Sequence, residues 1–230
     1  MTGTFINVGA VLAGTAVGLL VGGRLPDGAR RRVLAGLGLI TLVVGVDLAL
    51  AWRDTDPLFV LGGVLLGGLV GEAIGIEAWL ARLGDRIQAA VSGGEHSRVS
   101  EAFVTASLLF CVGPLTVVGA IQDGLTGDYD ALATKSMLDG FASIALTATL
   151  GWGVALAAGT VLVIQGGLSL GAGAFEDVLT GDALHALTSA GGVLIIGIAL
   201  KLLELTDVKV GNFLPALVIA PALAGVATLF

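Results

Sequence analysis

One stretch of the sequence gathers most of the side chains that could bind a ligand. Residues 113–143 read GPLTVVGAIQDGLTGDYDALATKSMLDGFAS and join the end of one apolar run to the start of the next. Carboxylate, amide and hydroxyl oxygens on neighbouring helix ends can coordinate a cation, or a carboxylate there can carry a proton. The candidate binding side chains are Gln122, Asp123, Ser136, Asp139 and Ser143.

The spacing of the last three residues supports a shared site. Ser136, Asp139 and Ser143 are separated by three and four residues, so they lie on one face if the segment is helical. Gly113-Pro114 precedes them and should break the helix in which it lies, because proline lacks a backbone N–H and clashes with the preceding turn. The break would free backbone carbonyls that must be satisfied inside the protein or by a cavity.

Asp139 also has a simpler interpretation. It could cap a helix that begins near Gly140, or pair with Lys135 one turn earlier at the outer membrane interface. Asp123 could likewise be a turn residue before Gly124. These alternatives and the binding site remain open from the sequence alone.

The composition indicates what kind of helices must position these groups. The chain has 230 residues, of which 56% are hydrophobic and 13% charged, and its mean hydropathy is +1.00. These values lie outside the range of soluble globular domains. The sequence therefore predicts an all-α integral membrane protein in which residues 1–230 form one transmembrane domain, with the lipid bilayer as its solvent.

Apolar runs bounded by charge, glycine or proline predict about eight transmembrane helices, or seven if the fifth and sixth are one. Their ranges are 3–23, 33–52, 57–76, 101–122, 134–151, 153–175, 186–205 and 211–230. The fifth and sixth are separated by a turn expected near Gly151-Trp152-Gly153.

The positive charges support this topology. With both termini outside, cytoplasmic loops and helix ends hold most of the 11 Lys and Arg residues, whereas only Arg53 and Lys135 lie outside. This bias predicts a multi-pass membrane protein with external termini. Residues 77–100 should add a cytoplasmic amphipathic helix, with Trp79, Leu80 and Leu83 on its apolar face, followed by a polar linker.

A weak internal repeat relates the two ends of the chain. Residues 13–46 and 163–198 share a glycine-rich helix, an acidic turn and a second glycine-studded helix. Matching spans 1–3 to spans 6–8 gives an offset of five helices, so the copies would be inverted, as in many secondary transporters. Three further polar residues at membrane depth are secondary site candidates: Asn7, Asp47 and Gln165.

Some of the glycines recur at a regular spacing along the predicted helices. The 37 glycines include rows at four-residue spacing: Gly14, Gly18 and Gly22, and Gly63, Gly67, Gly71 and Gly75. Such rows let transmembrane helices approach closely. They predict either tight packing within the chain or the seam of a homo-oligomer.

Several functional classes lack support in the sequence. No basic patch with interleaved aromatics suggests nucleic-acid binding. The single cysteine, Cys111, provides neither a disulfide nor a metal pattern. The motif HExxH is absent, and Ser107 and Ser143 have no obvious base nearby in the sequence, so we expect no enzyme and no cofactor, and the identity of any bound metal is unknown.

The sequence resembles a known family over nearly its whole length. The run FVTASLLFCVGPLTVVGAIQDGLTGDYDALATKSMLDGFASIAL, with the opening GTFINVGAVLAGTAVGLLVG and the closing NFLPALVIAP, is similar to the bacterial domain-of-unknown-function 554 (DUF554) membrane proteins of the YdfK/YqgA type. The resemblance implies a multi-span cytoplasmic-membrane protein, in a family sometimes described as transport proteins, and names no substrate.

Taken together, these features predict a transporter or channel-like protein for a small solute or ion, with a cation or a proton-coupled substrate favoured by the acidic ligands. The site should lie between the broken fourth span and the fifth. The alternative is a structural or regulatory membrane protein that oligomerises through its glycine faces and transports nothing.

Overall fold

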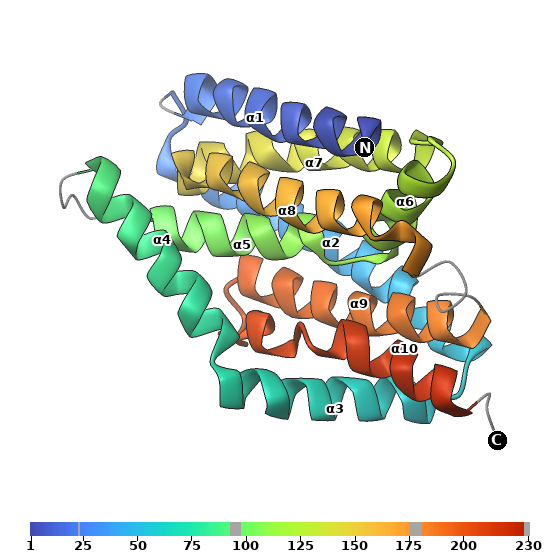
Figure 1. Ribbon diagram of the computed structural model, residues 1–230. Helices are drawn as coiled ribbons and strands as arrows, with labels where there is room; N and C mark the ends of the chain where they lie inside the picture. The colour runs from blue at the N-terminus through green and yellow to red at the C-terminus, as the bar shows by residue number, and fades with distance from the viewer. Residues whose placement is uncertain (23, 93–97, 175–180, 228–230) are drawn as a thin grey trace. The chain divides into compact units, whose positions relative to one another are not determined.

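The chain is all-helical over the residues that the computed structural model describes, which are 1–22, 24–92, 98–174 and 181–227. In these ranges the α-helices are α1 (Thr2–Gly22), α2 (Asp27–Ala49), α3 (Pro57–Ile74), α4 (Ile76–Ser92), α5 (Val99–Cys111), α6 (Pro114–Leu125), α7 (Asp130–Leu150), α8 (Ala157–Leu170), α9 (Gly181–Leu202) and α10 (Ala216–Ala227) (Figure 1). Short 3₁₀ helices join them: η1 (Leu50–Asp54), η2 (Trp152–Leu156), η3 (Ala172–Ala174) and η4 (Val210–Phe213).

Over the described residues, each apolar run that the sequence predicted as a span is largely helical. Within the described ranges, six helical stretches are long and apolar enough to cross a membrane, and the bent pair α5 and α6 makes a seventh if it counts as one span. The polytopic α-helical fold class is thus confirmed. The remaining predicted span is α7, whose 21 residues are long enough to cross a bilayer. It is not among the six because Lys135 and Asp139 lower its hydropathy.

Two predicted interruptions occur where the sequence placed them. α7 and α8 are separate helices, and α7 ends at Gly151, whose φ of 96° is a conformation that L side chains rarely adopt. α5 and α6 are bent by 61° across the break at Gly113-Pro114, where Gly113 has a φ of 128°. The predicted turn and the predicted helix break are both confirmed.

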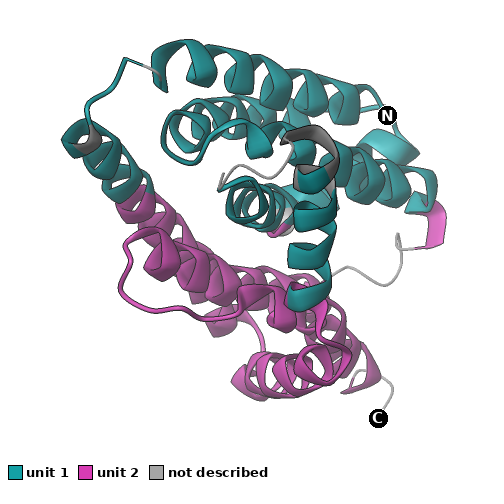
Figure 2. Cartoon of the chain, turned by 90° about the vertical axis from the view of Figure 1, so that its left-hand side faces the viewer, with its two compact units in different colours: residues 1–37, 78–111, 115–172 teal, residues 38–77, 112–114, 173–230 magenta. Residues whose placement is uncertain are grey.

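The chain divides into two compact units, coloured separately in Figure 2. Unit 1 comprises residues 1–37, 78–111 and 115–172, and unit 2 comprises residues 38–77, 112–114 and 173–230. α1, α5, α6, α7 and α8 belong to unit 1, whereas α3, α9 and α10 belong to unit 2. The single transmembrane domain predicted for residues 1–230 stays a prediction.

In unit 1, glycines let α1 lie directly on α7. A Cβ added at Gly14 would lie 2.9 Å from the Cβ of Ser143, and one added at Gly18 would lie 2.6 Å from the Cβ of Thr147. The residue numbers rise together along both helices, so α1 and α7 run parallel. Close approach of this kind strengthens dispersion contacts, which drive helix association in a bilayer.

In unit 2, the second glycine row packs against α10. A Cβ at Gly67 would lie 2.7 Å from the Cα of Ala216, and one at Gly63 would lie 2.7 Å from the Cα of Ala220. Here the numbers run in opposite directions, so α3 and α10 are antiparallel. The glycine faces of α1 and α3 are therefore used in packing within each unit.

The predicted amphipathic segment also forms a helix, α4. On this helix Leu80 is buried and Trp79 is exposed. Its position along the membrane interface stays a prediction. Residues 93–97 of the predicted linker lie outside the described residues.

Candidate functional site

Asp139 lies deeper in its helix than the sequence suggested. The fifth span was expected to begin at residue 134, but α7 begins at Asp130, whose backbone N–H donates to the Asp128 side chain at 3.1 Å. An aspartate before the helix and another in its first turn stabilise this start, because they bond to free N–H groups and complement the helix dipole. Asp139 is consequently the tenth of 21 residues, close to the middle of the helix.

The Asp139 carboxylate is buried and has two protein partners. Its Oδ2 accepts hydrogen bonds from the Lys135 ammonium, one turn earlier on α7, and from Asn7 Nδ2 on α1 at 2.9 Å. The side chains of Lys135 and Asp139 are only 7% and 8% exposed. The pair that the sequence allowed at the outer interface exists, but it lies inside the protein.

The bond to Asn7 fixes how that amide is oriented. A carboxylate accepts hydrogen bonds and cannot donate them, so the Asn7 NH₂ group must face Asp139. Asn7 Oδ1 then points elsewhere, and it makes no hydrogen bond with any described part of the protein although the residue is fully buried. Asn7 therefore offers an acceptor next to the buried carboxylate.

Further buried polar side chains lie on α1, on α7 and on α8, which contacts α1. We call the following residues the polar stripe: Thr4, Asn7 and Thr15 on α1, Lys135, Asp139, Ser143 and Thr147 on α7, and Gln165 on α8. All are buried, with Ser143 and Gln165 at 0% exposure. From Thr4 to Gly18, against which Thr147 packs, α1 rises about 21 Å, compared with about 30 Å for the hydrocarbon core of a bilayer.

Most of the stripe has hydrogen-bonding capacity that the protein does not use. Over the described residues, buried atoms without a hydrogen-bond partner include the hydroxyls of Thr4, Thr15, Ser143 and Thr147, Asn7 Oδ1, and both polar atoms of the Gln165 amide. Leaving a buried polar group unsatisfied costs about 1–3 kcal/mol. Such groups are normally satisfied by water, an ion or a bound molecule when the protein supplies no partner.

Other hydroxyls in the same chain do find backbone partners. Ser136 donates to the Leu132 carbonyl at 2.6 Å, and Thr188 donates to the Leu184 carbonyl at 2.8 Å, each one turn back in its own helix. This is the usual arrangement for serine and threonine in transmembrane helices. The stripe hydroxyls do not adopt it, so they remain able to bind something else.

Asp123 lies elsewhere in unit 1. Its carboxylate accepts hydrogen bonds from the amino group of Met1 at 2.9 Å and from the backbone N–H groups of Thr2 and Gly3 at 3.2 and 3.0 Å. These donors are the N-terminal groups of α1, which have no partner within their own helix. Asp123 thus caps α1 from α6.

We expect Asp123→Ala to lower the free energy of unfolding by about 1–2 kcal/mol, because it removes both a helix cap and a favourable charge at the α1 N-terminus. Asp123→Asn should lower the free energy of unfolding by less, since the asparagine amide oxygen can still accept hydrogen bonds from the α1 N–H groups. Thermal unfolding in detergent measures both, with the exposed Asp47→Ala on α2 as control. Unchanged stability in Asp123→Ala would contradict the capping role.

The remaining sequence-predicted candidates separate into two groups. Gln122 and Asp47 are exposed, and Ser136 is committed to its own helix. At the Gly113-Pro114 break, the Thr116 hydroxyl donates to the freed Phe110 carbonyl at 3.1 Å. The structure therefore joins Asp139 to Asn7 by a hydrogen bond and places Ser143 one turn further along the same α1–α7 contact. Gln165 is buried on α8, and the break is partly satisfied by the protein itself.

Sequence reasoning missed Thr4, Thr15, Thr147 and the buried position of Lys135. The spacing of two threonines could have indicated them. Thr4 precedes Asn7 by three residues and Thr147 follows Ser143 by four, so each lies on the same helix face as a predicted candidate. Threonine is common in transmembrane helices, so spacing alone did not distinguish these positions.

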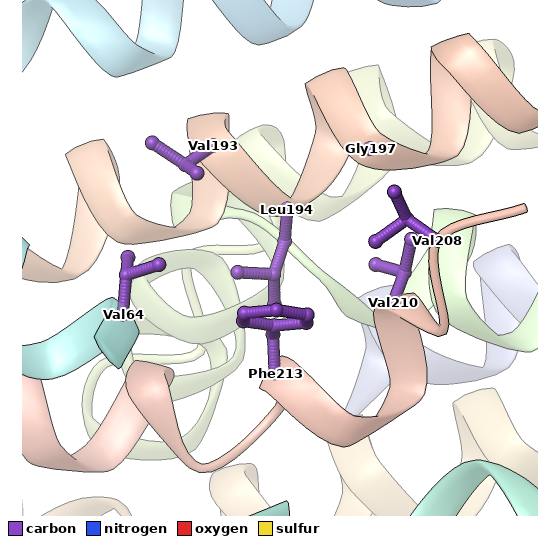
Figure 3. Close-up of a pocket in the computed structure, with 7 residues that line it drawn as sticks. All are labelled: Val64, Val193, Leu194, Gly197, Val208, Val210 and Phe213. Carbon is purple, nitrogen blue, oxygen red and sulfur yellow. The ribbon is translucent and has the colours of Figure 1, made fainter. Parts of the chain in front are cut away.

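Unit 2 offers less for chemistry. Its cavity of 80 Å³ is lined by apolar residues, including Leu194, Val210 and Phe213 (Figure 3). Asn212 lies between two of these lining residues in the sequence, and its Oδ1 accepts a hydrogen bond from the Glu77 backbone N–H at 2.8 Å. Lys201 Nζ forms an ion pair with the Glu77 carboxylate at 3.1 Å. These contacts connect the start of α4 to η4 and to the end of α9. We interpret them as structural.

No metal centre of the usual kind is built from the described ranges, where no group of three or more His, Cys, Asp or Glu residues could hold a metal ion. Any cation in the polar stripe would therefore be bound mainly by neutral oxygens and one carboxylate.

Comparison with known proteins places the chain in a family. The model of the family described as "Protein of unknown function (DUF554)" matches residues 2–225. The chain is 32% identical over 224 residues to the "Uncharacterized membrane protein YdfK" of Bacillus subtilis (strain 168), covering 96% of this chain and 94% of that protein. It is 30% identical over 226 residues to the "Uncharacterized protein YqgA" of Escherichia coli (strain K12), covering 96% and 95%. No solved structure matches significantly. The chain is therefore a membrane-embedded member of the DUF554 family.

Proposed function

We propose that the protein transports a small solute or ion across the cytoplasmic membrane through unit 1, with a cation or a proton-coupled substrate favoured. The observation that carries this proposal is the polar stripe, in which buried hydroxyl and amide groups lack protein partners along about 21 Å of helix. A protein with only a structural role gains nothing from such groups, because each one weakens its fold.

The position of the ionisable pair supports the same conclusion. Ionisable residues inside a membrane are costly and commonly mark ion or substrate pathways. Lys135 and Asp139 lie on a helix of membrane-spanning length and are almost fully buried. We place the site around Asp139 on α1, α7 and α8, rather than between α6 and α7.

Helix pairing supports a transporter through the proposed inverted repeat. α1 contacts α8 in unit 1, and Figure 1 shows the two running in opposite directions. In unit 2, α3 runs antiparallel to α10, and Gly45 of α2 packs against Ile196 of α9 while Gly192 packs against Ala49. Each helix of the first proposed repeat thus packs antiparallel to its counterpart in the second. Inverted repeats typically enclose the substrate site of secondary transporters.

The alternative function, a non-transporting protein that oligomerises through glycine faces, has less support. The glycine rows of α1 and α3 pack against α7 and α10. A homo-oligomer would need a different surface.

Flux measurements in proteoliposomes test the proposal. Wild-type protein should move a monovalent or divalent cation, or respond to a proton gradient, and Asp139→Asn should reduce that flux about 100-fold or more, as expected for the loss of a buried charged ligand. Asp47→Asn, which alters an exposed carboxylate, should leave it unchanged. If wild type and Asp139→Asn are indistinguishable under all these gradients, the transport proposal fails and the non-transporting alternative is favoured.

A further inference from the structure

We infer that the polar stripe binds a monovalent alkali-metal cation through Asp139, Asn7 and Ser143, and that the Lys135 ammonium holds the Asp139 carboxylate when the cation is absent. This inference deepens the proposed function, on which it rests, by naming the ion and the group that competes with it.

The three proposed ligands belong to α1 and α7. Asn7 donates to Asp139, so the two side chains are adjacent, and Asn7 Oδ1 is a buried acceptor without a protein partner. Ser143 follows Asp139 by one helical turn on the face that packs against Gly14 of α1, and its hydroxyl also lacks a partner in the described structure. A carboxylate, an amide oxygen and a hydroxyl oxygen therefore lie along the same contact between α1 and α7.

The charge of the polar stripe favours a monovalent ion. Asp139 is the single carboxylate of the polar stripe, and the other oxygen groups are neutral. Calcium and magnesium sites generally require several carboxylates or substrate phosphates to offset the cost of dehydration. Neutral oxygens can replace the hydration shell of a monovalent cation, as backbone carbonyls do in potassium-channel filters. One negative charge among neutral oxygens thus matches an ion with one positive charge.

Lys135 would compete with the cation for the Asp139 carboxylate. Its ammonium already occupies Asp139 Oδ2, so a second cation at the carboxylate would leave an excess positive charge in a buried site. Lys135 lies five residues after the start of α7, or about 8 Å along the axis, and helical side chains tilt toward the N-terminus. Its flexible side chain can extend toward that end, where Asp128 and Asp130 are exposed. The exchange keeps the stripe neutral in both states.

Thermal unfolding of the purified chain in detergent tests the inference. We compare sodium chloride, potassium chloride and choline chloride at equal ionic strength. At least one alkali salt should raise the Tm of the wild-type protein above its value in choline, because a ligand that binds only the folded state stabilises it. An equal Tm in all three salts would overturn the inference.

Two variants locate the site. Ser143→Ala removes a proposed ligand and should weaken the alkali response about tenfold in apparent Kd. Ser136→Ala is the matched control, because its hydroxyl lies on the same helix but is bonded to the Leu132 carbonyl, and it should keep the response. If both variants respond like the wild type, the cation does not bind in the stripe.

Lys135→Met tests the competitor. The variant removes the internal ammonium, so it should bind the alkali cation about tenfold more tightly or more, and should need that cation for full stability. A weaker response than that of the wild type would show that Lys135 helps the cation to bind, and would overturn the competitor role.

Failure of this inference and failure of transport give different results. If solute flux is as fast in choline as in alkali salts and Tm shows no alkali response, transport stands and the cation site is overturned. If the alkali response follows the variants as described but proteoliposomes show no flux, the cation site stands and the transport function fails.

Discussion

Replacing Asp139 by leucine should destabilise the protein more than replacing Lys135 and Asp139 together. The single substitution leaves the Lys135 ammonium buried at 7% exposure without its carboxylate partner. Removing one member of a buried ion pair typically costs about 3–5 kcal/mol, whereas replacing both by apolar residues of similar size is often close to neutral. We therefore expect Lys135→Met/Asp139→Leu to recover most of the stability that Asp139→Leu loses.

The comparison is a double-mutant cycle measured by unfolding in detergent, with all four proteins kept in choline chloride so that no alkali cation compensates for a missing charge. A matched cycle is available at the surface. The Arg98–Glu101 pair at the start of α5 is likewise local in sequence, but its side chains are 51% and 44% exposed, so its coupling should be below about 1 kcal/mol. Equal coupling in the two pairs would show that the Lys135–Asp139 pair is not buried in the folded protein.

Adding a single methyl group at Gly18 should also weaken the fold. A Cβ at this position would lie 2.6 Å from the Cβ of Thr147 and 2.7 Å from the Ile144 carbonyl oxygen, so α1 and α7 would have to separate. Overpacking of this kind usually costs about 1–3 kcal/mol. We expect Gly18→Ala to lower the Tm in detergent, and to reduce flux if the polar stripe depends on the same helix contact.

Gly9 on the same helix provides the control. A Cβ there would meet nothing within 4 Å, and alanine is favoured over glycine in a helix by up to about 1 kcal/mol. Gly9→Ala should therefore keep or raise the Tm. If the two variants behave alike, α1 does not pack on α7 through its glycine row.

The predictability of the site differs from residue to residue. The prominence of Asp139 was visible in the sequence because a carboxylate in an apolar run is costly and rare. Asp123 seemed equivalent, yet its carboxylate caps α1. Its partners are 120 and 121 residues away, so no local rule could have assigned them. Lys135 was recognised as a neighbour of Asp139, but its burial depends on α1, which covers that face of α7.

The packing partners of the glycine rows were also not predictable from the sequence. Four-residue spacing predicted that Gly14, Gly18 and Gly22 form a packing face. Spacing could not distinguish a neighbouring helix of the same chain from a second copy, because both would present small apolar surfaces. The structure places α7 on this face and α10 on the corresponding face of α3.

By itself, the sequence determined that the chain is a bundle of membrane helices, where most of them begin and end, where Gly113-Pro114 and Gly151 interrupt them, and that Asp139 lies among apolar residues. These properties follow from local apolarity, charge and backbone conformation. The tertiary structure alone decided that Asp139 meets Asn7, that Asp123 caps another helix and that the stripe hydroxyls lack partners. The reason is physical: in a membrane nearly every helix face is apolar, so hydropathy does not select which faces meet, and close packing between distant segments does.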